Sequence, residues 1–320
     1  MNKLSIFALK ALRKLYTKSF GKTPEKPVCE QDPDIASQII YDALVSDKPC
    51  MIARFGSTEL LCLKNYLGVK NNKGKYLDYI CGKAQQWWWE KNIINQMQQW
   101  SGFFPAKEDK IEQFCELMIK DMPQVDVLGS WLVDEKLFER ELKNCPKINL
   151  ELLNPYFSNI PWTKALEEKK VLVVHPFAND IMQQYQKREL LFKNNILPNF
   201  ELITIKAVQS LAEEETEFKD WFEALDYMKA EIDKVDYDIC LIGCGAYGFP
   251  LAAHVKRNGK KAVHVGGSLQ LLFGIKGKRW ENSNYNPIYN YAQLMNEYWI
   301  YPSDDSKPKN ANIVENACYW

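Results

Sequence analysis

One segment late in the chain, residues 235–280, restricts the fold more than any other. The apolar run 238–242 leads directly into GCGAYG at residues 243–248, a Gly-x-Gly-x-x-Gly turn placed after a predicted strand. Residues 251–257 predict a helix, and residues 261–265 predict the next strand. Such a unit is typical of α/β folds with a parallel sheet, and the N–H groups at the start of its helix can bind an anion.

The residues after this unit indicate a ligand with phosphates. Small residues follow the second strand, and a basic cluster comes next: Gly266, Gly267, Ser268, then Lys276, Lys278 and Arg279. A nicotinamide or flavin dinucleotide is one alternative, but domains that bind it carry a carboxylate about 20 residues after the glycine turn to hold the ribose hydroxyls. Residues 265–268 contain no acid. We therefore expect a nucleotide ligand but no NAD.

Composition excludes some classes of function. Lysine plus arginine equals aspartate plus glutamate, at 41 each, so no overall positive field favours nucleic acid. The nine cysteines form no Cys-x-x-Cys pair and the three histidines form no His-x-x-x-His pair. This spacing argues against a zinc site and predicts reduced thiols in a cytoplasmic protein.

Residues 1–33 predict a basic amphipathic appendage. Apolar side chains recur at helical spacing, and seven Lys or Arg residues face a single acid, Glu25, within residues 1–27. Two interpretations stay open. Residues 1–22 could lie on the anionic inner face of a membrane, or the helix could dock on its own domain. The segment is too short and too charged to span a bilayer.

The rest of the chain predicts one α/β domain at 34–300, with a helical insertion at about 77–120 and a loose C-terminal tail at 301–320. Apolar runs predict strands, and helical patterns separate most of them. The strands are expected at Cys50–Arg54, 125–128, 170–174, Glu201–Lys206, 238–242 and 261–265, and further helices at 34–46, 180–194 and 217–233. This alternation predicts a Rossmann-like, mostly parallel sheet with helices on both faces and ligands at its carboxyl edge.

The first predicted strand ends in RFGSTE, residues 54–59. Ser57 is a suitable N-cap for the next helix, and Glu59 falls in its first turn, where the helix dipole favours an acid. Arg54 needs a partner in an apolar setting, which either Glu59 or a ligand phosphate would provide. A capped helix without any ligand is the alternative.

A second polar segment, HPFAND, follows the strand at 170–174. His175 could act as a general base or as a hydrogen-bond donor, and Asn179 or Asp180 could cap the next helix. A purely structural histidine is the alternative.

Together these segments resemble a known family. Arg-Phe-Gly-x-x-Glu after the first strand, the strand ending in His-Pro-Phe-x-Asn, and the late glycine-rich unit are similar to bacterial glycosyltransferases of the GT-D fold, over roughly residues 34–280. The resemblance implies a Rossmann-like sheet, a nucleotide-sugar donor, and a glycan or lipid-linked acceptor in the synthesis of cell-surface polysaccharide or glycoprotein. It also implies a divalent metal at an Asp-x-Glu motif.

The chain departs from that metal motif, because Ser57-Thr58-Glu59 leaves Glu59 as its single carboxylate. Mg²⁺ or Mn²⁺ could bind weakly through Glu59, or the basic cluster could neutralise the leaving diphosphate without a metal. Glu59 or His175 could accept the acceptor proton, and since Glu59 cannot serve as metal ligand and base at once, we assign it to donor binding. Tryptophans such as Trp131, Trp162 and Trp280 could stack on the sugar or the base.

We therefore expect Glu59 and His175 to be catalytic. The residues expected to bind the nucleotide sugar are Arg54, Phe55, Gly56, Ser57, Asn179, Gly243, Gly245, Tyr247, Gly248, Gly266, Gly267, Ser268, Lys276, Lys278 and Arg279. Two functions from other classes stay open: an NAD(P)-dependent oxidoreductase that uses the turn at 243–248, and a non-catalytic scaffold of the same fold.

Overall fold

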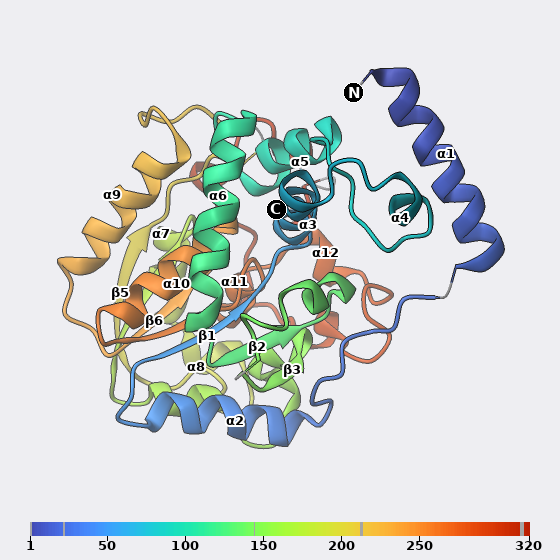
Figure 1. The fold of residues 1–320 in the computed structure, drawn as a ribbon. Coiled ribbons are helices and arrows are strands. Elements are labelled where there is room, and N and C mark those ends of the chain that lie inside the picture. The colour runs from blue at the N-terminus through green and yellow to red at the C-terminus, as the bar shows by residue number, and fades with distance from the viewer. Residues whose placement is uncertain (1, 22, 144, 212–213, 314–316) are drawn as a thin grey trace.

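A parallel β-sheet forms the centre of the molecule (Figure 1). The computed structural model describes residues 2–21, 23–143, 145–211, 214–313 and 317–320, and within them seven strands pair in the order β3-β2-β1-β7-β6-β4-β5. They are β1 (Cys50–Arg54), β2 (Val127–Ser130), β3 (Lys147–Asn149), β4 (Lys170–His175), β5 (Glu201–Lys206), β6 (Ile239–Ile242) and β7 (Lys261–His264). Every pairing is parallel, which confirms the predicted α/β fold.

Helices cover both faces of the sheet (Figure 1). They are α1 (Lys3–Phe20), α2 (Pro33–Val45), α3 (Ser57–Asn71), α4 (Tyr76–Ile80), α5 (Lys91–Ser101), α6 (Glu108–Asp121), α7 (Ala178–Tyr185), α8 (Arg188–Leu191), α9 (Trp221–Asp233), α10 (Gly248–Arg257), α11 (Leu269–Leu272) and α12 (Lys278–Glu281). Short 3-10 helices in the connections are η1 (Met122–Gln124), η2 (Val133–Phe138), η3 (Leu150–Leu153), η4 (Pro155–Phe157), η5 (Trp162–Leu166), η7 (Gly245–Tyr247), η8 (Tyr291–Leu294), η9 (Asp304–Ser306) and η10 (Ala311–Ile313).

Each strand contributes to two hydrophobic cores because successive side chains point to opposite faces of a sheet. In β4, Val171 and Val173 pack in one core, and Leu172 and Val174 pack in the other. Burial on both faces explains why the strands appear in the sequence as nearly continuous apolar runs rather than alternating ones.

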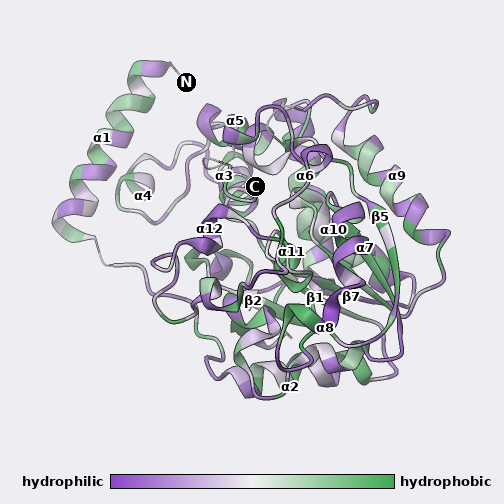
Figure 2. Cartoon of the chain, turned by 180° about the vertical axis from the view of Figure 1, so that it is seen from behind, coloured by the Kyte–Doolittle hydropathy of each residue, from purple (hydrophilic) through white to green (hydrophobic). Residues whose placement is uncertain are grey.

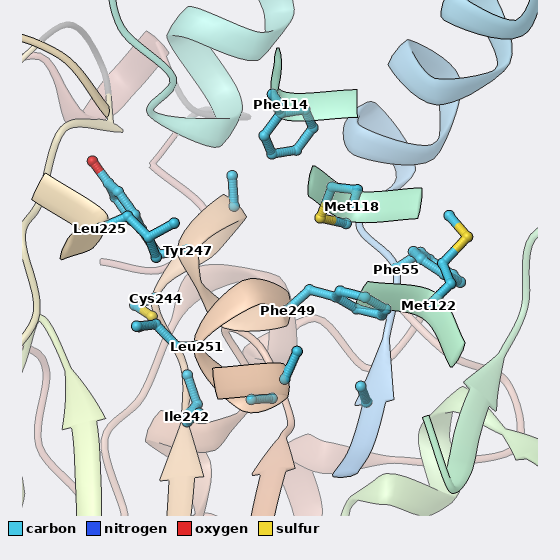
Figure 3. Packing of buried hydrophobic residues seen from close by; sticks show 14 of the residues in the cluster. Phe55, Phe114, Met118, Met122, Leu225, Ile242, Cys244, Tyr247, Phe249 and Leu251 are labelled. Carbon is cyan, nitrogen blue, oxygen red and sulfur yellow. The ribbon is translucent and has the colours of Figure 1, made fainter. Parts of the chain in front are cut away.

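The core on one face joins α10 to α3, α6 and α9 (Figure 3). The ring of Phe55, just after β1, stacks on Phe249 of α10 with centroids 4.8 Å apart. Tyr247 stacks on Trp221 of α9 with centroids 4.9 Å apart. These contacts hold the ends of β1 and β6 in fixed positions.

Most predicted elements are present, with three differences. The strand β3 was missed, since it is only three residues long and buries Ile148 alone between half-buried neighbours. The single helix expected at 180–194 is instead α7 and α8, separated by a turn in which Lys187 N–H donates to the Gln184 carbonyl. The helical region expected at about 77–120 consists of α4, α5 and α6.

The N-terminal helix α1 is present and lies at the periphery, next to α4 (Figures 1 and 2). Leu9 is buried, and Arg13 Nη1 donates to the Ala84 carbonyl at 3.0 Å. Across the described residues, the structure has no helix that is both long and apolar enough to cross a bilayer. Lys22, which the sequence places in the same basic segment, lies outside the described residues.

The strand order places four strand ends side by side. β1, β7, β6 and β4 are consecutive neighbours in the sheet, and all four run in the same direction. Their carboxyl ends therefore meet at one edge, where open α/β sheets bind their ligands.

Candidate functional site

A pocket of about 160 Å³ opens at this edge. The loops after β1, β4, β6 and β7 line it together with α5, Trp131 and the last residues of the chain. Ten of the residues predicted from the sequence are in its lining: Arg54, Gly56, Ser57, Glu59, His175, Gly243, Gly245, Gly266, Gly267 and Arg279. These predicted residues therefore gather around one pocket at the carboxyl edge of the sheet.

Arg54 brings a positive charge into the pocket, and it has no anionic partner among the residues that the structure describes. Its Nε atom is buried and has no hydrogen-bond partner, and Arg54 forms no ion pair with any described carboxylate. The guanidinium lies 5.8 Å from the ring centre of Trp131. A Cβ atom on Gly266 would be 3.4 Å from Arg54 Cζ, so the side chain lies directly against this backbone. Burying a cation without a partner is unfavourable, and an anionic ligand would remove that cost.

Glu59 is buried beside Arg54's loop and is the one acid among the described residues that line the pocket. Helix α3 has Gly56 as its N-cap, with no side-chain cap, so the prediction that Ser57 caps the helix is wrong. Ser57 is the first helical residue and is exposed. The Glu59 carboxylate folds back over Gly56, where a Cβ atom would overlap it. Glycine at position 56 therefore makes room for this carboxylate at the rim.

His175 ends β4 and is neutral. Burial lowers the pKa of His175 to about 3. Its Nδ1 accepts a hydrogen bond from Phe177 N–H at 3.0 Å, so in the neutral ring the proton is on Nε2. His175 can therefore donate a hydrogen bond to a ligand through Nε2. It is poorly suited to accept a proton.

His264, at the end of β7, is a second neutral histidine in the lining and was not predicted. Burial, with the neighbouring Arg54 charge, lowers the pKa of His264 to about 3. Its Nδ1 is buried and has no hydrogen-bond partner. No sequence pattern marks this residue apart from its position at a strand end.

Glu135 fixes the loop after β2 that carries Trp131. The buried Glu135 carboxylate accepts hydrogen bonds from the backbone N–H groups of Trp131 and Leu132, both at 2.9 Å, and from the hydroxyl of Ser130. The Trp131 Nε1–H donates to the Phe55 carbonyl at 3.1 Å. The indole is thereby held at the pocket wall, and it stays 39% exposed.

The tryptophans differ in exposure and therefore in whether they can contact a ligand. Trp162 and Trp280, also expected to stack on a ligand, are buried at 1% and 3% exposure and cannot. Trp100 of α5, which the sequence did not single out for this role, lines the pocket and is 38% exposed.

The glycine turn contributes residues 243–246, but not its last two residues, to the pocket. Gly243 and Gly245 line it, and Gly245 has a positive φ of 57°. Tyr247 and Gly248 turn away into the core, so their expected contact with a ligand is wrong. The Tyr247 hydroxyl shares a hydrogen bond with Ser210 at 3.0 Å instead. Phe55, likewise expected at the ligand, packs its ring in the core and offers only its carbonyl, which Trp131 occupies.

Of the three residues in the predicted basic cluster, one lines the pocket and two do not. Arg279 lines the pocket, and its Cζ lies 5.0 Å from the ring centre of Tyr319. Lys276 and Lys278 lie outside the lining, and Lys276 Nζ instead sits 5.4 Å from the ring centre of Tyr301. Ser268 is outside the lining as well, and so is Asn179, which is exposed on α7.

The end of the chain packs against the pocket rather than forming the expected loose tail. Tyr319 and Trp320 line the pocket, and the Tyr319 carbonyl accepts from Gln270 Nε2 at 3.0 Å. Trp320 Nε1–H donates to the Ser306 carbonyl, and the Ser306 hydroxyl donates to Asp180 at 2.8 Å. Asp180, expected as a helix cap, therefore anchors this segment, because its carboxylate is buried against the segment's hydroxyl and amide donors.

Neither family models nor curated proteins match the sequence. Among solved structures, the chain is similar to a selenomethionine-substituted "domain of unknown function 1792", with a TM-score of 0.35 and 11% sequence identity. The superposition covers 93% of this chain and 96% of that one. The TM-score and the identity are too low to carry a functional conclusion, so the function has to be inferred from the pocket.

The acidic side chains do not form an evident metal centre. In the part of the chain that the structure describes, no three His, Cys, Asp or Glu side chains gather in a group that could hold a metal ion. Mg²⁺ and Mn²⁺ sites are built from several oxygen ligands, of which the lining supplies the Glu59 carboxylate and the Ser57 and Thr58 hydroxyls. This donor set fits a divalent cation poorly.

Proposed function

We propose that this pocket binds a nucleotide-activated sugar and that the protein transfers the sugar to a hydroxyl of a glycan or lipid-linked acceptor. The observation that carries the proposal is Arg54, a cation that forms no ion pair with any described residue, at the meeting point of four strand ends. A pyrophosphate supplies the missing charge. The motif resemblance to GT-D glycosyltransferases, given by the segments at 54–59 and 175–180, supports the same class of reaction.

Arg54 and Arg279 would hold the diphosphate together, since both guanidinium groups lie near Tyr319. The His175 Nε2–H would donate to a ligand oxygen. Guanidinium groups suit phosphates because they present several donors in one plane. The exposed faces of Trp131 and Trp100 would pack against the apolar face of a sugar ring, or against the base.

The chemical step requires one base and stabilisation of one leaving group. The acceptor oxygen forms a bond to the anomeric carbon while the bond from that carbon to the diphosphate oxygen breaks, and the acceptor proton has to leave. Since His175 carries its proton on Nε2, we assign the base to Glu59, which revises its expected role in donor binding. The arginine charges stabilise the negative charge that develops on the departing diphosphate.

We propose that no divalent cation is required for this step, because the described residues of the lining offer a single acidic side chain, Glu59, which is needed as the base. An EDTA titration of donor turnover tests this directly. Full loss of turnover with EDTA and its recovery with Mn²⁺ would contradict this part of the proposal while leaving the transferase assignment intact.

A thermal-shift screen against uridine, guanosine, cytidine and thymidine diphosphates and their sugars, with and without Mn²⁺, tests donor binding. A ligand at 100 times its Kd stabilises the folded state by about 2.7 kcal/mol, so the correct donor should be distinct from the others. Arg54→Ala should abolish this shift, and the unliganded variant should lose little stability, because the change removes a charge that forms no ion pair with any described residue. Lys276→Ala is the matched control and should retain the shift.

The same experiment separates the two alternatives. Stabilisation by NADH but by no nucleotide sugar would favour an oxidoreductase and contradict the proposal. A donor that binds but is never turned over with any acceptor, or by hydrolysis, would indicate a non-catalytic scaffold. An unchanged shift in Arg54→Ala would place the nucleotide site elsewhere.

A further inference from the structure

The N-terminal helix α1 has two apolar faces, of which only one is covered. At about 100° per residue, Leu9, Arg13 and Tyr16 fall on one side of the helix. Leu9 is buried, and Arg13 lies 4.5 Å from the ring centre of Tyr79 in α4. A hydrogen bond between Tyr16 and Cys81 lies on the same side. This side is docked on the protein, as one of the two sequence interpretations expected.

The opposite side of α1 exposes large apolar side chains. Leu4, Phe7 and Leu15 are 80%, 73% and 63% exposed, and they share this side with Ala8 and Ala11. A helix that only docked on its own domain would gain nothing from apolar residues here. Figure 2 shows α1 at the edge of the molecule, beside α4.

The charges of α1 indicate what covers this face. The helix carries five basic residues and no acid: Lys3, Lys10, Arg13, Lys14 and Lys18. Lys10 is paired with Glu90 at 2.7 Å, but Lys3, Lys14 and Lys18 are exposed and form no ion pair with any described residue. On the helical wheel, Lys3 and Lys14 border the exposed apolar stripe and Lys18 lies within it. Their long stems can lie along the stripe while their charges reach outward.

We propose that this outward face of α1 lies on an anionic lipid surface while the inward face stays docked on α4. An apolar stripe bordered by lysines fits the boundary between acyl chains and anionic headgroups, where both parts of the helix are satisfied. A second copy of this chain fits poorly, because two such faces would bring lysines against lysines. The two interpretations of the N-terminal segment are then compatible. One side of α1 docks on the protein, and the other side lies on the lipid surface. The inference does not depend on the proposed transferase activity.

Co-sedimentation of the full chain with vesicles tests the proposal. We expect binding to vesicles of phosphatidylcholine mixed with phosphatidylglycerol, and little binding to phosphatidylcholine alone. Lys3→Gln, Lys14→Gln and Lys18→Gln combined should weaken binding at least tenfold, since each lysine near an anionic surface contributes about fivefold. Phe7→Ser with Leu15→Ser should weaken it by roughly tenfold or more.

Ile288→Ser is the matched control, because Ile288 is an equally exposed apolar side chain outside α1 and should leave binding unchanged. All exchanged residues are exposed, so circular dichroism and the nucleotide thermal shift should be unaffected. Three results would overturn the proposal: no sedimentation with either vesicle, equal binding to both vesicles, or a dimer in analytical ultracentrifugation that Phe7→Ser with Leu15→Ser abolishes.

Discussion

The loop after β1 and the glycine turn after β6 both lie at the pocket, yet they do different things there. The end of β1 and the loop after it bring chemistry into the pocket, through Arg54, which forms no ion pair with any described residue, and the buried Glu59. The glycine turn mainly provides space. A Cβ atom on Gly243 would be 2.7 Å from His175 Cδ2, and one on Gly248 would be 2.3 Å from His264 Nε2. The glycine turn is the more conspicuous motif in the sequence, yet it contributes fewer charged side chains to the pocket than the segment after β1.

Glu59→Gln is the strongest test of this division. If Glu59 is the general base, its amide should reduce donor turnover by about 100-fold or more without lowering donor affinity to the same extent. Release of nucleoside diphosphate from the donor measures the effect. The exposed Glu189→Gln serves as the control. Normal turnover in Glu59→Gln would show that Glu59 is not the general base.

Gly248→Ala tests the structural role of the glycine turn. The new methyl group would overlap the His264 ring, so we expect a loss of about 3 kcal/mol in the free energy of unfolding. Urea denaturation measures it. Gly259→Ala is a useful comparison, because nothing lies within 4 Å of its Cβ position and its cost comes only from its positive φ of 78°. Equal stability of Gly248→Ala and the native chain would contradict the close packing.

His175 and His264, which pack against glycines of the turn after β6, should make the free energy of unfolding fall in acid. Their folded-state pKa values of about 3 lie below the unfolded value of about 6.5. Between these values the unfolded chain binds more protons, so stability falls as the pH decreases below about 6.5. The loss is about 2 kcal/mol for each histidine at pH 5. Denaturation of His264→Gln across this range should show a smaller loss between pH 7 and pH 5, and an unchanged loss would mean that the histidine is not the cause.

Tyr247→Phe should have the smallest effect. It removes the hydroxyl that shares a hydrogen bond with Ser210 but keeps the ring stacked on Trp221, so the free energy of unfolding should fall by about 1 kcal/mol. Donor affinity should not change, because the side chain points into the core. A clear loss of donor affinity would mean that Tyr247 takes part in donor binding, and it would weaken the distinction between the two loops.

These two loops also show how far sequence reasoning reaches. The strand β1 was predicted at its observed bounds, and the loop after it was placed at the edge of the sheet where the pocket lies, because buried parallel strands are continuous apolar runs. Tyr247 was misplaced because its partner, Trp221, comes from α9, and no local pattern encodes that contact. Tyr319 and Trp320 were missed for the same reason, since their polar surroundings in the sequence suggested exposure.

The pairing of β1 with β7 determines when this site can exist. Met51 pairs with Ala262, so one side of β1 stays without its neighbour until the ribosome has passed β7. Until then the side chain of Arg54 has no Gly266 backbone to lie against, and the unpaired edge of β1 is available to other extended chains. A nascent or truncated chain that stops before this strand should therefore bind no nucleotide and should depend on chaperones, however well its first half has folded.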